Sequence, residues 1–255
     1  MTTSSAERVA QLLLAFEPDG PGGEIERSVS ELARIVGRER TQVSRMLRSL
    51  STTKVVEQDP ETRRYRLGWR MRALASEAGD RVLCRAARPM LQALVARTGE
   101  ATLLSVLEGN RSLTVMREEP HNSLRGGGWV GRRSPLNCTA SGRVLLFDYD
   151  DEVIDALTEE DLQQHPGAHG QAPADLSELI TRVRAEHRRG YSRASEEIEV
   201  GLTSIGVPVR DIHRRVIAAV NVSGPTQRLE GRVDEVARLL MAASASITRA
   251  LTKGR

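Results

Sequence analysis

Residues 28–67 constrain the fold more than any other stretch of this 255-residue chain. Within them, apolar side chains recur with the i, i+3, i+4, i+7 spacing of one helix face, at Val43, Met46, Leu47 and Leu50. The opposite face is polar and cationic, and it comprises Arg40, Thr41, Gln42, Ser44, Arg45 and Arg48. The pattern predicts a helix that buries one face and presents the other to phosphates and base edges.

A shorter helix is predicted over residues 30–36, immediately upstream. Its N-cap is either Ser30 or Ser28, and Glu31 would complete a capping box with Ser28. Gly37 ends it, and the three residues from this glycine to the next helix match the length of a helix-turn-helix turn. Residues 28–50 are therefore interpreted as a helix-turn-helix.

A β-hairpin is predicted after the second helix, with strands over residues 54–57 and 63–67. Asp59 and Pro60 supply the turn between them. Such a hairpin would form the wing of a winged helix-turn-helix and add further cations. Together these segments predict nine DNA-contacting residues: Arg40, Thr41, Gln42, Ser44, Arg45, Arg48, Lys54, Arg63 and Arg64.

The distribution of charge separates this interpretation from an ordinary three-helix bundle with a solvated, arginine-rich face. Residues 34–88 carry 14 Lys and Arg against 6 Asp and Glu, whereas the whole chain carries 37 against 34. The remainder is therefore acidic, with 23 against 28. A basic block in an otherwise acidic molecule is the charge pattern of a polyanion-binding surface.

Composition predicts a globular cytoplasmic protein. The chain contains no apolar run of about 18 residues that could span a membrane, and its first residues lack the pattern of a signal peptide. Its two cysteines, Cys84 and Cys138, form neither a disulfide framework nor a metal-ligand motif. No metal or cofactor is expected.

The chain is expected to divide into three parts. Residues 1–68 form the DNA-binding domain, which opens with a helix over residues 4–16 capped by Ser4 and Glu7. Residues 69–88 form one or two linker helices, and residues 89–255 form an α+β domain that begins with a helix at Pro89.

Within the α+β domain, Gly109 and Asn110 are expected to join the first two strands as a hairpin. Residues 124–137 and 163–173 are expected to be irregular. The remaining predictions are strands over residues 101–108, 112–118, 191–197, 203–209 and 216–222. Helices are predicted over residues 143–147, 150–161, 176–189 and 233–251.

Four motif blocks resemble the isocitrate lyase regulator (IclR) family of bacterial transcription factors along nearly the whole chain. They are ELARIVGRERTQVSRMLRSL, SPLNCTASGRVLL, RGYSRASEEIEVGLTSIGVPVRD and VIAAVNVSGPTQRL, in the family's order. The resemblance implies a GAF-like effector-binding domain, a small-molecule effector such as an organic acid or aromatic metabolite, and homodimers or tetramers on a double-stranded operator. Carried over by motif, the effector site comprises Ala140, Ser141, Ala194, Leu202, Ser204, Asn221 and Ser223.

One departure from the family concerns the junction between recognition helix and wing. The family usually carries a glycine there, whereas this chain has Ser51, Thr52, Thr53 and Lys54. Operator, effector, sign of control and the choice between dimer and tetramer stay open.

Three alternatives compete with an effector-controlled regulator. An enzyme would need a nucleophile such as Cys138 with His121 as its base, but the chain shows no complete catalytic motif or phosphate loop. A redox sensor would use the same cysteine. A constitutive DNA-binding oligomer without a ligand is the third. The family resemblance favours the regulator, and no enzymatic activity is expected.

Overall fold

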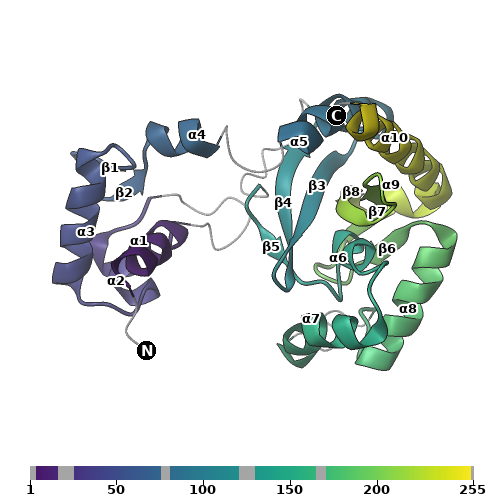
Figure 1. Cartoon of the computed structure of the whole chain (residues 1–255), viewed down its shortest axis with the longest axis horizontal. Coiled ribbons are helices and arrows are strands. Elements are labelled where there is room, and N and C mark those ends of the chain that lie inside the picture. Colours follow the sequence, from purple (N-terminus) through teal and green to yellow (C-terminus); the bar gives the residue numbers. More distant parts are fainter. Residues whose placement is uncertain (1–3, 17–25, 76–80, 121–129, 165–170, 254–255) are drawn as a thin grey trace. The chain divides into compact units, whose positions relative to one another are not determined.

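The computed structural model describes residues 4–16, 26–75, 81–120, 130–164 and 171–253. These residues form two compact units, one ending at Arg81 and the other beginning at Val82 (Figure 1). His121 lies outside the described residues. The stretches expected to be irregular, residues 124–137 and 163–173, are described only in part.

The N-terminal unit contains the predicted helix-turn-helix and wing. Its elements are α1 (Ser5–Leu14), α2 (Val29–Ile35), α3 (Arg40–Thr52), β1 (Val56–Gln58), β2 (Tyr65–Leu67) and α4 (Trp69–Ala75). Capping boxes start α1 at Ser4 and α2 at Ser28, so Ser28 and not Ser30 is the N-cap of α2. Both motifs satisfy backbone N–H groups that a helix start leaves unbonded.

The core of this unit collects the apolar stripes of its helices and wing. Val43 and Leu47 of α3 are fully buried, and Met46 and Leu50 pack partly buried beside them, as their spacing predicts. The rest of the core is Leu12, Ala15, Phe16, Leu32, Ala33, Val56 and Tyr65. The packing fixes which face of α3 points away from the core.

Two left-handed residues shape the turns around α3. Gly37, at φ +61°, ends α2, and the N–H of Arg38 then donates to the carbonyl of Ala33 over 2.9 Å. Lys54 also has a positive φ, of +60°. The chain therefore adopts, without a glycine, the left-handed backbone at the junction where its family usually has one.

The expected helix start at Pro89 is wrong. Helix α5 runs from Arg81 to Thr98 and passes through Pro89, which lies on its exposed side. A proline inside a helix costs about 3 kcal/mol, whereas burying one leucine side chain contributes about 1.5–3 kcal/mol. Burial of Leu83, Leu91 and Leu94 therefore stabilises the continuous helix by more than Pro89 destabilises it.

The C-terminal unit is built on a six-stranded antiparallel sheet, which confirms the predicted α+β class. Its strands are β3 (Ala101–Glu108), β4 (Arg111–Glu118), β5 (Arg133–Ser134), β6 (Ser192–Ser195), β7 (Leu202–Arg210) and β8 (Val216–Pro225). Their order is β5-β4-β3-β8-β7-β6. Gly109, at φ +58°, and Asn110 form the predicted hairpin turn.

Helices cover both faces of the sheet (Figure 1). Helices α5 and α10 (Val233–Lys253) pack on one face around residues such as Val207, Val220 and Leu240. On the other face lie α6 (Ala140–Leu145), α7 (Asp151–Gln164) and α8 (Leu176–Arg189). Among the described residues, no helix is long and apolar enough to cross a membrane.

Several boundaries in this unit differ from the predictions. Helix α6 begins at Ala140, three residues before the predicted start, because Thr139 accepts a hydrogen bond from the N–H of Gly142 over 3.0 Å and caps it. Strand β5 lies in a stretch expected to be irregular, and α9 (Thr226–Leu229) with the 3-10 turn Glu230–Arg232 was not predicted. The bounds of α8 match the prediction, since Asp175 caps it and Gly190 ends it at φ +85°.

Candidate nucleic-acid interface and effector site

Helix α3 divides its side chains as the sequence predicts. Val43 and Leu47 have no exposed surface, whereas the residues of the opposite face are exposed: Arg40, Thr41, Gln42, Arg45 and Arg48. Ser44 is half-buried and accepts a 3.4 Å hydrogen bond from Arg48. The exposed face carries three guanidinium groups and one amide, which are donors for phosphates and purine edges.

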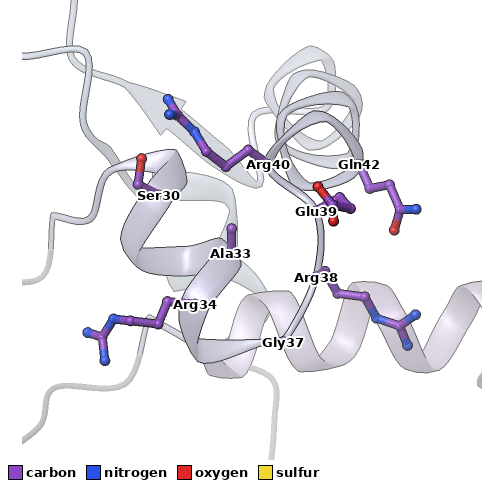
Figure 2. A pocket seen from close by; sticks show the side chains of 8 residues that line it. All are labelled: Ser30, Ala33, Arg34, Gly37, Arg38, Glu39, Arg40 and Gln42. Atoms are coloured by element: carbon purple, nitrogen blue, oxygen red, sulfur yellow. The ribbon is translucent and has the colours of Figure 1, made fainter.

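An open hollow of about 590 Å³ lies between α2 and α3 at their turn. Figure 2 shows its lining: Ser30, Ala33, Arg34, Gly37, Arg38, Glu39, Arg40 and Gln42. In that view Arg38 and Gln42 point to one side, and Arg34 and Arg40 point to the other. Within the described part of the chain, none of these three arginine side chains makes a hydrogen bond or ion pair. Their donors are available to an external anion.

Of these arginines, the sequence analysis identified only Arg40 as a DNA contact. Arg34 and Arg38 were missed because helix periodicity directs attention to α3, while Arg34 lies in α2 and Arg38 in the turn. The local excess of arginine over acidic residues was the one signal that pointed to them.

The wing residues predicted to contact DNA differ from one another. Lys54 and Arg63 are exposed, and their side chains make no ion pair within the described chain. Arg64 instead donates from Nε and Nη2 to the carbonyl oxygen of Glu26, over 3.2 and 2.9 Å, and from Nη2 to Glu31 Oε1 over 3.1 Å. The guanidinium of Arg64 therefore braces the wing against the start of α2.

The strand residues predicted for the effector site share one face of the sheet. Ala194, Ser204 and Ser223 are direct cross-strand partners on β6, β7 and β8. Leu202 and Asn221 each lie two residues from a member of this row on β7 and β8, so their side chains point to the same face. Cross-strand partners have Cβ atoms about 4.5–5.5 Å apart. The register thus gathers five predicted residues.

Helix α6 brings the other two predicted residues to that face. A Cβ on Gly206, one row away on β7, would lie 3.2 Å from the carbonyl oxygen of Ala140, so α6 sits directly on the sheet there. Ser141 accepts a 3.1 Å hydrogen bond from the hydroxyl of Ser112 on β4. All seven predicted residues are buried or half-buried, and together they are small and mildly polar.

A fully buried arginine joins the elements around this face, and the sequence analysis missed it. Arg143 of α6 forms ion pairs with Glu186 of α8, at 3.0 Å, and with Glu197, at 2.6 Å, between β6 and β7. Burial alone would lower the pKa of its guanidinium, but the two carboxylates more than offset this and raise the pKa. Arg143 stays charged, and its partners lie 43 and 54 residues away in sequence.

Cys138 has the environment of a packing residue. It is buried, and burial raises the pKa of its thiol to about 12, with the carboxylate of Glu197 adding to the effect. The thiolate is the reactive form of cysteine, so this site does not favour nucleophilic or redox chemistry. Among the described residues, no group of His, Cys, Asp and Glu side chains could hold a metal ion.

Comparison with known proteins agrees with this architecture. The model of the bacterial transcriptional regulator IclR C-terminal domain matches residues 77–249, and that of the IclR helix-turn-helix domain matches residues 5–60. The chain belongs to the IclR family. It is a DNA-binding transcriptional regulator with an IclR effector domain, and the family consists of regulators and not of enzymes.

Several IclR-type proteins are similar to it along their whole length. The glycerol operon regulatory protein of Streptomyces griseus is 31% identical over 98% of this chain and 97% of its own. The regulator XynR of Escherichia coli K12 is 27% identical over 97% of this chain and 96% of its own. A solved IclR homolog of Microbacterium hydrocarbonoxydans, complexed with 4-hydroxybenzoate, shares 25% identity and a TM-score of 0.85, covering 98% of this chain and all of its own.

Proposed function

We propose that this IclR-type regulator binds a pseudo-palindromic operator as a homodimer, or as a pair of dimers, with α3 in the major groove. The observation that carries the proposal is the division of α3 into a buried face at Val43 and Leu47 and an exposed face of donors. One recognition helix reads too few base pairs for genomic specificity, and a two-fold axis doubles the site. Trp69 and Leu74 of α4, 75% and 60% exposed, offer apolar surface for self-association.

Within this interface, base reading and phosphate binding fall to different side chains. Thr41, Gln42 and Arg45 lie in the first two turns of α3, the part that a helix-turn-helix directs at base edges. Glutamine suits adenine, and arginine suits guanine. We assign phosphate binding to Arg40, Arg48, Lys54 and Arg63, and the hollow adds Arg34 and Arg38. Arg64, which the sequence alone also assigns to DNA, is excluded because its guanidinium is bonded to Glu26 and Glu31.

Two substitutions test this division on an operator selected from random duplex DNA. Gln42→Ala should cost about 1–3 kcal/mol on the operator and relax preference at one base pair per half-site. Arg38→Ala should weaken operator and random DNA alike and make the log-log salt slope shallower by about one per site. Arg188→Ala removes an exposed guanidinium from α8 of the C-terminal unit and should change neither. Identical specificity profiles for the first two variants would contradict the placement of α3.

The effector proposal concerns the α6 face of the sheet in the C-terminal unit. We propose that it binds an organic acid or aromatic metabolite, and that the regulator acts in the cytoplasm. Support comes from the seven predicted residues gathered there, most of them small, and from the Microbacterium homolog whose structure contains 4-hydroxybenzoate. Ser204→Trp should remove the effector response while operator binding is kept, because the indole would fill ligand volume on the C-terminal unit.

A thermal-shift screen of the full chain against organic and aromatic acids tests the effector itself. A ligand at about 100 times its dissociation constant adds about 2.7 kcal/mol to stability. If no compound raises the melting temperature or changes operator binding, the constitutive DNA-binding oligomer is the correct alternative.

A further inference from the structure

Three uncharged side chains of the C-terminal unit have buried polar atoms that make no hydrogen bond among the residues that the structure describes. They are Asn137, at both amide atoms, Asn221, at Oδ1, and Ser192, at Oγ. Their exposed fractions are 0%, 6% and 0%. Buried polar atoms in native proteins are nearly always bonded, so unbonded ones require a partner such as a water molecule or a ligand.

The sheet register places two of these residues beside the proposed effector site. Ser192, Gly206 and Asn221 are successive cross-strand partners on β6, β7 and β8. This row is adjacent to the row of Ala194, Ser204 and Ser223 and shares its face. The glycine between the two unbonded side chains is the residue that Ala140 of α6 covers. Both side chains therefore point toward α6.

Asn137, just before α6, is tied to the same strand by Arg143. Nη1 of Arg143 donates to the carbonyl oxygen of Asn137 over 2.9 Å, and Nη2 donates to that of Arg193 over 2.5 Å. Arg193 lies between Ser192 and Ala194 on β6. The guanidinium of Arg143 therefore holds the backbone of Asn137 close to β6, the strand on which Ser192 and Ala194 begin the two rows.

The residue before Asn137 is fixed by a second buried charge. The N–H of Leu136 donates to Asp161 Oδ2 over 3.0 Å, and Asp161, with no exposed surface, is also bound by Arg111. Backbone anchors on both sides of its side chain limit where the amide of Asn137 can move. A fixed, unbonded amide is a preorganised ligand-binding group.

The electrostatic surroundings define which group this amide can receive. Arg143 directs its donors at Glu186, Glu197 and the two carbonyl oxygens, so none is left for an effector. Both carboxylates have a second partner, because Arg182 pairs with Glu197 at 3.4 Å and Arg189 pairs with Glu186 at 3.1 Å. Each of these cations is already held by a carboxylate, so none is left to bind an anion, whereas a neutral hydroxyl needs no counter-charge.

We propose that Asn137, together with Asn221, binds a neutral hydroxyl group of the effector, an assignment that rests on the effector function proposed above. Nδ2 of Asn137 donates to the hydroxyl oxygen, and Oδ1 of Asn221 accepts its proton. A hydroxyl satisfies both kinds of unbonded atom, because it is donor and acceptor at once. Asn137 is thereby the residue that makes the site prefer a hydroxylated ligand over its unsubstituted analogue.

Calorimetric titration of the full chain with 4-hydroxybenzoate and benzoate tests this assignment. The wild-type chain should bind 4-hydroxybenzoate about 10-fold more tightly, the size of one buried hydrogen bond. Asn137→Leu keeps the side-chain volume and removes both polar atoms, so it should bring the two affinities within about twofold while leaving benzoate affinity and melting temperature unchanged. Asn110→Leu, in the hairpin where the amide is already bonded to Glu160, is the control and should keep the preference.

Each other outcome has a definite meaning. An unchanged 10-fold preference in Asn137→Leu overturns the assignment. Equal loss of both ligands with a lower melting temperature also overturns it, because it shows that the amide supports the fold. If the wild-type chain binds neither compound, the proposed effector class is wrong, and the assignment falls with it.

Discussion

Arg64→Ala should destabilise the DNA-binding unit, although the sequence alone assigns this arginine to DNA. Its guanidinium makes two hydrogen bonds to the carbonyl of Glu26, of 3.2 and 2.9 Å, and one to the carboxylate of Glu31. A hydrogen bond to a charged group contributes roughly 1.5–3 kcal/mol when buried. The side chains of Arg64 and Glu31 are 32% and 39% exposed, however, so solvent screening reduces the sum. We expect a loss of about 1–2 kcal/mol, or roughly 5–10 °C in a unit of this size.

Scanning calorimetry of the full chain, together with DNA binding at several salt concentrations, measures both possible roles. Arg63→Ala is the matched control, since it removes the neighbouring positive charge from a side chain that makes no hydrogen bond in the described structure. The control should make the salt slope shallower without lowering the melting temperature. If Arg64→Ala behaves like this control, with full stability and a shallower slope, Arg64 is a phosphate ligand and the bracing role is wrong.

Three further predictions concern local contacts. The hydroxyl and N–H of Ser28 lower the pKa of Glu31 to about 2. The contribution of the Glu31 carboxylate to stability is therefore complete above about pH 4.5 and is lost as the pH falls toward 2. Denaturation curves of Glu31→Gln at several pH values should lack that part of the acid dependence. Gly142→Ala should lower the melting temperature, since its Cβ would lie 2.6 Å from backbone, whereas Gly231→Ala meets nothing within 4 Å and should not. Cys138 should resist iodoacetamide at pH 8 in the folded protein, because burial raises the pKa of its thiol to about 12. Mass spectrometry of the labelled peptides measures this, and rapid labelling of Cys138 would contradict the prediction.

Elements with local signals were predictable from the sequence. The stripe through Val43 and Leu47 and the capping box at Ser28 are each contained within a few residues, so they specify α2 and α3 directly. Pro89 misled the prediction because a proline is a local signal of helix termination, whereas the burial that keeps α5 continuous comes from residues of the sheet and α10. Tertiary packing overrode local preference there.

The same limit applies to the charged residues of the candidate sites, because the sequence locates them but does not show which partners they bind. Counting arginines located the basic unit, but it did not distinguish Arg38 from Arg64. Among the described residues Arg38 makes no ion pair, whereas Arg64 pairs with Glu31. Arg64 and Glu31 are 33 residues apart, and no periodicity connects such partners. The sequence also could not show that the amide of Asn137 lacks a hydrogen-bond partner, because this depends on every segment that packs around it in the fold.

The buried ion pairs of Arg143 limit how this regulator can be re-engineered or diverge. Removing one member of a buried ion pair typically costs about 3–5 kcal/mol, whereas replacing the whole set by apolar residues can be neutral. Arg143, Glu186 and Glu197 come from three separate segments. A specificity graft that transplants α6 alone would bury Arg143 in the host protein without its two carboxylate partners. The exchangeable module is therefore α6 with α8 and the β6–β7 connection, and substitutions at these three positions should be inherited together.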